Sequence, residues 1–103
     1  MSLLVTNQTL GDERSVTVVG EVDVSNANEL RSALDEALAS NATAIRVDLG
    51  QVPYIDSTGI GVLVGAARRA EEANATLVVC NPQRNVARVL SLLGVGEELG
   101  VDL

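Results

Sequence analysis

The chain has 103 residues, and its 47% hydrophobic content suits one compact domain. Its 14 acidic residues outnumber its 7 basic residues, so the net charge of -7 opposes binding to nucleic acid or to an anionic membrane surface. Because the sequence contains no His and no Lys, it lacks the usual neutral-pH general base and the lysine of a phosphate-binding loop, which argues against most hydrolytic and nucleotide-binding mechanisms.

Two β-branched segments open the chain and predict an antiparallel hairpin. Residues 3–10 and 15–22 flank the turn-forming stretch at residues 11–14. An amphipathic helix is expected next, with Ser25 or Asn26 as its cap. Apolar residues recur in it at spacings of three and four, which indicates one buried face, formed by Ala27, Leu30, Leu34, Ala37 and Leu38.

The second half of the chain alternates strands and helices. Residues 44–49 alternate apolar and charged side chains as a strand with one covered face does, and residues 57–74 form a helix that is apolar around most of its circumference. Residues 75–80 predict an inner strand. A last helix is expected to open with Asn81 as cap and Pro82 at its first position, to end at Gly94, and to face inward with Val86, Val89, Leu90 and Leu93.

These elements predict an α/β domain over residues 1–103 with the order ββαβαβα. The sheet should be mixed, since the opening hairpin is antiparallel and the later crossovers are right-handed and parallel, and the helices should lie mainly on one face. Residues 96–103 are too few for more than an edge strand or a frayed tail. The lone Cys80 falls in an apolar run and is expected to be a buried structural thiol.

The sequence offers no strong catalytic, cofactor or metal pattern. Acidic residues that are neighbours in sequence, such as Glu71 and Glu72, point in different directions and fit a solvated surface. The glycines at positions 59, 61 and 65 lie inside a helix rather than in the turn before it, so close helix packing is a better interpretation than a phosphate cradle. No charged start with an apolar stretch of signal-peptide length and no membrane-spanning run occurs, so we expect a cytoplasmic protein.

One polar cluster has the character of a functional site. Asp56, Ser57 and Thr58 come at the predicted start of the central helix, where free backbone N–H groups and the helix dipole favour an anion. A phosphoacceptor hydroxyl would be tolerated there. The same residues also fit a simple helix cap, and their types and spacing alone leave both interpretations open.

Residues 47–63 resemble the phosphorylation-site segment of the STAS domain family, and especially that of bacterial anti-sigma factor antagonists of the sporulation and stress-response type. Gly20-Glu21-Val22-Asp23, the helix start Ser25-Asn26-Ala27 and residues 81–86 match the same pattern in the same order. The resemblance covers almost the whole chain. Many members continue past their final strand into a last helix, whereas this sequence stops at Leu103.

The resemblance implies a protein switch without catalytic activity, cofactor or metal. Ser57 is then the phosphoacceptor, and Asp23, Asp56, Thr58 and Gly59 join it in the partner-binding surface. The unmodified form would bind an anti-sigma factor serine kinase and release the sigma factor; phosphorylation would end binding, and a serine phosphatase would reset the switch. The alternatives are a STAS-type scaffold or transport-associated regulatory subunit that is not phosphorylated and, from another class, a small nucleotide-binding or hydrolytic enzyme.

Overall fold

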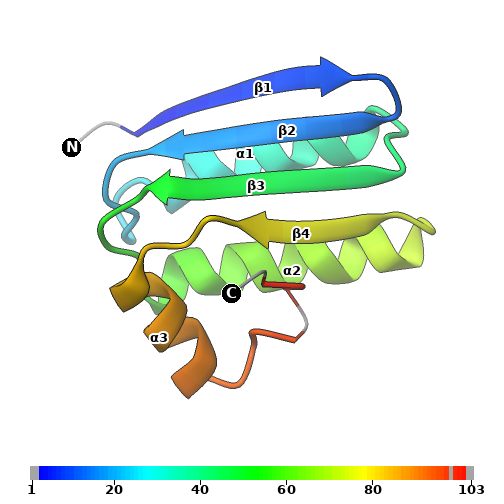
Figure 1. The fold of residues 1–103 in the computed structure, drawn as a ribbon. Coiled ribbons are helices and arrows are strands. Elements are labelled where there is room, and N and C mark those ends of the chain that lie inside the picture. Colours follow the sequence, from blue (N-terminus) through cyan, green and yellow to red (C-terminus); the bar gives the residue numbers. More distant parts are fainter. Residues whose placement is uncertain (1–2, 98, 102–103) are drawn as a thin grey trace.

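The computed structural model describes residues 3–97 and 99–101, which form a four-stranded sheet and three helices (Figure 1). The order ββαβαβα matches the prediction. In chain order the elements are β1 (Leu4–Leu10), β2 (Glu13–Val19), α1 (Ala27–Ala39), β3 (Ala44–Gln51), α2 (Ser57–Glu72), β4 (Thr76–Cys80) and α3 (Arg84–Leu92).

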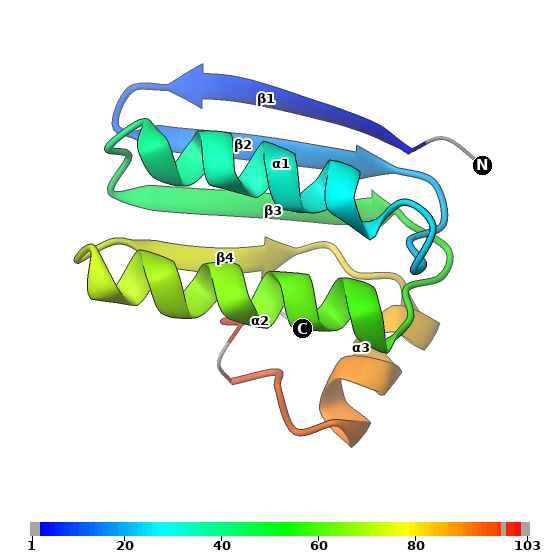
Figure 2. The same cartoon turned by 180° about the vertical axis from the view of Figure 1, so that it is seen from behind.

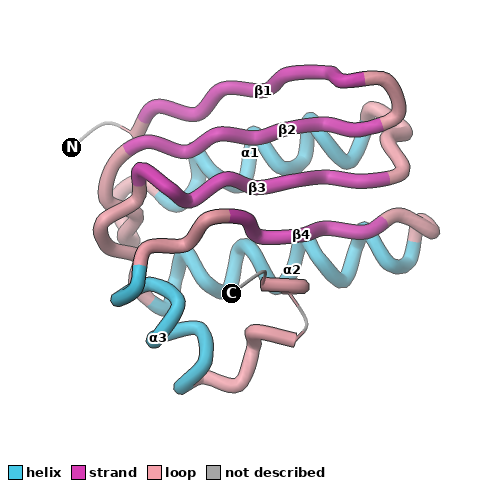
Figure 3. The backbone as a smooth tube through the Cα atoms, viewed as in Figure 1, coloured by secondary structure: helices cyan, strands magenta, loops and turns pink. Residues whose placement is uncertain are grey.

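The sheet is mixed, as predicted, and its strands lie in the order β1-β2-β3-β4. β1 pairs antiparallel with β2, while β2 with β3 and β3 with β4 are parallel. The carboxyl ends of β2, β3 and β4 therefore share one edge, and the loops that leave them start side by side (Figure 3).

The core lies between the sheet and the helix pair α1 and α2, which cover the same face (Figure 2). Leu30 and Leu34 of α1 and Leu63 of α2 are fully buried against inward residues of the strands, such as Val47. This position explains why α2 is apolar on most of its sides, because it packs both on the sheet and on α1.

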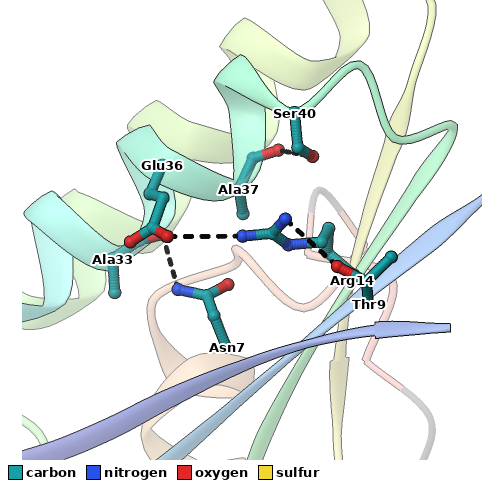
Figure 4. A network of polar contacts seen from close by, with 7 residues as sticks. All are labelled: Asn7, Thr9, Arg14, Ala33, Glu36, Ala37 and Ser40. Atoms are coloured by element: carbon teal, nitrogen blue, oxygen red, sulfur yellow. Dashed lines mark hydrogen bonds and ion pairs between the residues drawn. The ribbon is translucent and has the colours of Figure 1, made fainter.

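Polar contacts join the hairpin to α1 at the end of β2 that lies away from the carboxyl edge (Figure 4). The Arg14 guanidinium donates to the Thr9 hydroxyl at 3.2 Å and lies 3.6 Å from a Glu36 carboxylate oxygen. The Asn7 amide donates to the Ala33 carbonyl at 3.3 Å. These contacts add polar links to the apolar packing of the hairpin, in which Val16 and Val18 of β2 are fully buried in the core.

The start of α3 differs from the prediction. Asn81 adopts a left-handed conformation, φ 54°, and turns the chain out of β4, so the helix begins at Arg84 with Gln83 as its cap residue. Pro82 lies before the helix rather than in its first turn. Asn is suited to both roles, since its side chain also tolerates left-handed backbone. The predicted cap at Asn81 was therefore wrong.

The predicted inward face of α3 is also too wide. Val86 and Leu90 are buried, but Val89 is 36% exposed and Leu93 is 53% exposed. The helix lies beyond the β4 edge of the sheet (Figure 1), and its buried residues are confined to Val86 and Leu90. Its end is as predicted: Gly94 has φ 71°, and the Val95 amide donates back to the Leu90 carbonyl at 3.1 Å.

The segment after α3 folds back onto β4 without forming a strand in its described part. Leu99 is fully buried, and its carbonyl accepts a hydrogen bond from the Val79 amide at 2.9 Å. The Leu99 amide donates to the Val95 carbonyl, which closes a turn. Residues 96–97 and 99–101 are thus packed in turns rather than in the expected edge strand or frayed tail, and residues 98 and 102–103 lie outside the described residues.

Candidate functional site

Two loops at the carboxyl edge of the sheet are held together by backbone hydrogen bonds. The Val22 amide donates to the Tyr54 carbonyl at 2.9 Å, and the Asp56 amide donates to the Val22 carbonyl at 3.1 Å. Val22 and Ile55 thereby form an isolated parallel bridge beyond the ends of β2 and β3. Asp23 and Asp56 each follow one residue of this bridged pair, so Asp23 lies beside the segment that leads into Ser57, as the shared edge predicts.

Asp56 is the residue that caps α2. Its extended backbone places the carboxylate oxygen Oδ1 to accept from the Thr58 amide at 3.0 Å and from the Gly59 amide at 3.1 Å. Ser57 and Thr58 are exposed, and within the described part of the chain their hydroxyls make no hydrogen bond. Different residues therefore cap the helix and present hydroxyls to solvent: the Asp56 carboxylate caps α2, and the Ser57 side chain is exposed.

The Asp23 loop is fixed by its own side chains. The Asp23 carboxylate accepts from the Ser25 amide at 2.9 Å and from the Ser25 hydroxyl at 2.5 Å. These bonds, led by the one from the hydroxyl, hold the pKa of Asp23 below its ordinary value. The hydrogen bonds therefore stabilise the charged form of Asp23 and fix its carboxylate on the loop that pairs with the segment before Asp56.

Asn26 has a role that the sequence did not indicate. It occupies the cap position of α1, as expected, but its buried side chain does not cap that helix. Its amide instead donates to the Glu21 carbonyl at 2.8 Å and its oxygen accepts from the Asp23 amide at 2.9 Å. The first turn of α1 is closed by the Asp23 carbonyl, which accepts from the Ala27 amide at 2.9 Å. Asn26 thus holds the loop that carries Asp23.

Gly59 lies behind the exposed surface and acts there through packing. A methyl group at this position would stand 2.7 Å from Cγ1 of Val22 and 2.8 Å from Cγ1 of Ile55. The absence of a side chain therefore allows α2 to approach the Val22–Ile55 bridge. Gly61 and Gly65 face open space, so the expected close packing of the helical glycines applies to Gly59 alone.

Two side-chain amides tie the start of α3 to the end of β3 and to the loop that follows it. The Gln83 amide donates to the Gly50 carbonyl at 3.1 Å, and the Asn85 amide donates to the Pro53 carbonyl at 2.6 Å. Both residues fall in the stretch that matches the family pattern, but no simple rule of spacing indicates these contacts across more than thirty residues. They hold in place the segment that leads to Ser57.

The remaining chemistry of the described residues is sparse. Residues 3–97 and 99–101 contain no group of three or more His, Cys, Asp or Glu side chains arranged for a metal ion. Cys80 is buried, in keeping with a structural thiol. None of the helices in these ranges has the length and apolar character needed to cross a membrane.

Comparison with known proteins identifies the family. The model of the family described as Mlab, STAS domain, matches residues 5–101. The anti-sigma-B factor antagonist of Bacillus subtilis is 31% identical over 86 residues, which cover 84% of this chain and 78% of that protein. The chain belongs to the anti-sigma factor antagonists of the STAS domain family. Proteins of this kind are regulators without enzymatic activity.

Further relatives agree with this assignment. The anti-sigma-B factor antagonist of Listeria monocytogenes is 30% identical over 86 residues, covering 84% of this antagonist and 75% of the relative. The fold is shared with the anti-sigma factor antagonist SpoIIAA. Its unphosphorylated form superposes with a TM-score of 0.81 at 20% identity, over 97% of this chain and 89% of that one. Its phosphorylated form gives a TM-score of 0.74 at 20% identity, over 97% and 92%.

Proposed function

We propose that the unmodified antagonist binds an anti-sigma factor that is also a serine kinase, and that this binding releases a sigma factor in the cytoplasm. Phosphorylation of Ser57 by the kinase ends the binding, and a serine phosphatase restores it. The observation that carries the proposal is the exposed Ser57 hydroxyl at the first position of α2, next to a cap that another residue supplies. The related SpoIIAA has been solved in an unphosphorylated and a phosphorylated form, which supports a switch of this type.

The arrangement of charges explains how a phosphate would act. A phosphate adds about 1.5 to 2 negative charges at neutral pH. The Thr58 and Gly59 amides already donate to Asp56, so they are not available to bind the new group. The phosphate would therefore point into the partner surface beside the carboxylates of Asp56 and Asp23. Its charge and volume oppose the interface, while the capped helix keeps the fold.

A kinase assay with mass spectrometry tests the proposal on wild type, Ser57→Ala and Thr58→Ala. We expect wild type and Thr58→Ala to be phosphorylated and Ser57→Ala to resist. Ser57→Ala should still fold and bind, because Asp56 keeps the cap. Ser57→Asp should fold and bind about tenfold to a hundredfold more weakly, since a carboxylate carries part of the charge of a phosphate.

The pattern of results separates the possible roles. Phosphate that persists in Ser57→Ala and disappears in Thr58→Ala would move the switch to Thr58. Binding without phosphate on any of the three proteins would favour a STAS scaffold or transport-associated subunit that docks through the same helix. Absence of both binding and phosphate with the cognate anti-sigma factor would refute the proposed function.

A further inference from the structure

Two large apolar side chains are exposed on the two loops that carry the candidate site. Val24 is 74% exposed and Tyr54 is 50% exposed. We propose that these two residues are the apolar anchors of the partner surface, and that they enter an apolar depression on the anti-sigma factor whose rim is basic. This inference rests on the proposed function and names the chemistry of the partner at that same site.

Backbone pairing brings the two anchors into one patch. Tyr54 accepts the Val22 amide through its carbonyl, and Val24 follows Val22 by two residues. Neighbouring strands lie about 4.8 Å apart, and Val24, which lies in a turn, is at most about 7 Å along the chain from Val22, so the two backbones lie within about 12 Å of each other. A standard protein interface covers about 800 Å² on each partner, so one interface includes both residues together with Ser57.

The loops present these side chains on a rigid support. Val22 and Ile55, which form the bridge between the loops, are 0% and 3% exposed. The bonds of Asn26 and of the Asp23 carboxylate fix the turn that holds Val24. Little backbone order has to be gained on binding, and this preorganisation favours affinity. The Val24 and Tyr54 side chains do not belong to the buried core, which is consistent with a role outside folding.

The charges around the anchors indicate the chemistry of the rim. The paired segments at residues 20–26 and 50–58 contain Glu21, Asp23 and Asp56 and no Lys or Arg, and the adjoining start of α3 adds one cation, the exposed Arg84. Acidic groups therefore outnumber basic groups around the anchors. Electrostatic complementarity then requires Lys or Arg on the facing surface of the partner. A phosphate on Ser57 would lie between the two apolar anchors and the acidic side chains of Asp23 and Asp56.

The chain supplies matched controls at the carboxyl end of α3, away from the end whose Asn85 side chain bonds to Pro53. Leu92, the last residue of the helix, is 76% exposed, and Leu93, which follows it, is 53% exposed, close to the values for Val24 and Tyr54. The four variants Val24→Ser, Tyr54→Ala, Leu92→Ser and Leu93→Ala therefore remove comparable exposed apolar groups at two places. Affinity of each unphosphorylated variant for the cognate anti-sigma factor is measured by isothermal titration calorimetry, and thermal unfolding confirms that each one folds.

We expect Tyr54→Ala to weaken binding about tenfold or more and Val24→Ser about threefold to tenfold, since aromatic residues dominate interface energetics and Val contributes less. Both control variants should bind as wild type does. Raising the salt to about 1 M, where the Debye length is about 3 Å, should weaken wild-type binding.

Two results would refute the role of Val24 and Tyr54 as anchors: wild-type affinity in Val24→Ser and Tyr54→Ala, or an equal loss of affinity in the α3 controls. Affinity that does not fall with salt would overturn the basic rim, and a wild type that neither binds nor is phosphorylated would instead refute the proposed function.

Discussion

Replacing Gly59 by Ala places a methyl group at the closest contact between α2 and the candidate site. The added Cβ would lie 2.7 Å from Cγ1 of Val22 and 2.8 Å from Cγ1 of Ile55. Both neighbours are buried and β-branched, so neither side chain rotates away freely. The helix must therefore shift outward, or the bridge between the two loops must open.

The expected change in the free energy of unfolding has two opposing parts. Overpacking of this kind costs about 1 to 3 kcal/mol. Ala is a better helix former than Gly by about 1 kcal/mol, and position 59 gains at most this amount because it lies in the first turn. We expect a net destabilisation of about 1 to 2 kcal/mol, which lowers the melting temperature of a chain of this size by roughly 4 to 15 °C.

Gly61→Ala is the matched control, because it makes the same chemical change two residues later in the same helix. A methyl group at position 61 meets no atom within 4 Å. This variant should be more stable than wild type by about 0.5 to 1 kcal/mol. Urea unfolding followed by circular dichroism measures both variants, and the amide resonances of Asp23 and Ser25 report whether the loop moves in Gly59→Ala.

The two variants are expected to change stability in opposite directions. Equal stabilisation of both would show that Gly59 is not held against Val22 and Ile55. Destabilisation of both by the same amount would mean that a general property of the helix, rather than the contact at Gly59, decides the outcome. Either result would refute the packing argument for this residue.

Three further changes test the loops. Asp56→Ala removes the cap of α2 and should lower the free energy of unfolding by about 1 kcal/mol in urea titrations. The folded-state pKa of Asp23 lies below its ordinary value of 3.8. The stability that Asp23 contributes is therefore present above pH 3.8 and is lost as the pH falls through the folded-state pKa. Asp23→Asn should remove this part of the acid dependence of unfolding. Asn85→Ala removes the bond to the Pro53 carbonyl, so hydrogen exchange of the Asp56 amide should accelerate, whereas the control Ser91→Ala on the same helix should leave it unchanged.

The regular elements could be predicted from the sequence because their patterns reflect burial. Alternation in residues 44–49 and the spacing of Leu30 and Leu34 correspond to side chains that are inward in the structure. The errors occur where one residue type suits two backbone roles, or where an apolar spacing continues past the core. Asn81 was expected to cap a helix and instead takes a left-handed turn, and Leu93 continues an apolar spacing that has no core to meet. Local pattern does not show how far a helix extends beyond the edge of a sheet.

The candidate site was predicted unevenly for a related reason. The resemblance indicated Ser57 and Asp23 as members of one surface, and the parallel pairing of β2 with β3 explains why the two loops meet. No pattern separated the cap from the hydroxyl, since Asp56, Ser57 and Thr58 are all able to cap; only the bonds of the Asp56 carboxylate decide this.

The exposed residues of the two loops were not predictable because exposure is a property of the folded surface. In sequence, Val24 is the same residue type as its buried neighbour Val22, and Tyr54 adjoins the buried Ile55, so the difference in exposure arises only when the bridge turns Val22 and Ile55 inward. The same bridge fixes the cap and the loop that flank Ser57. Under the proposed function, a phosphate on Ser57 would therefore act on a surface whose backbone is already fixed, and it would alter binding without requiring the domain to unfold.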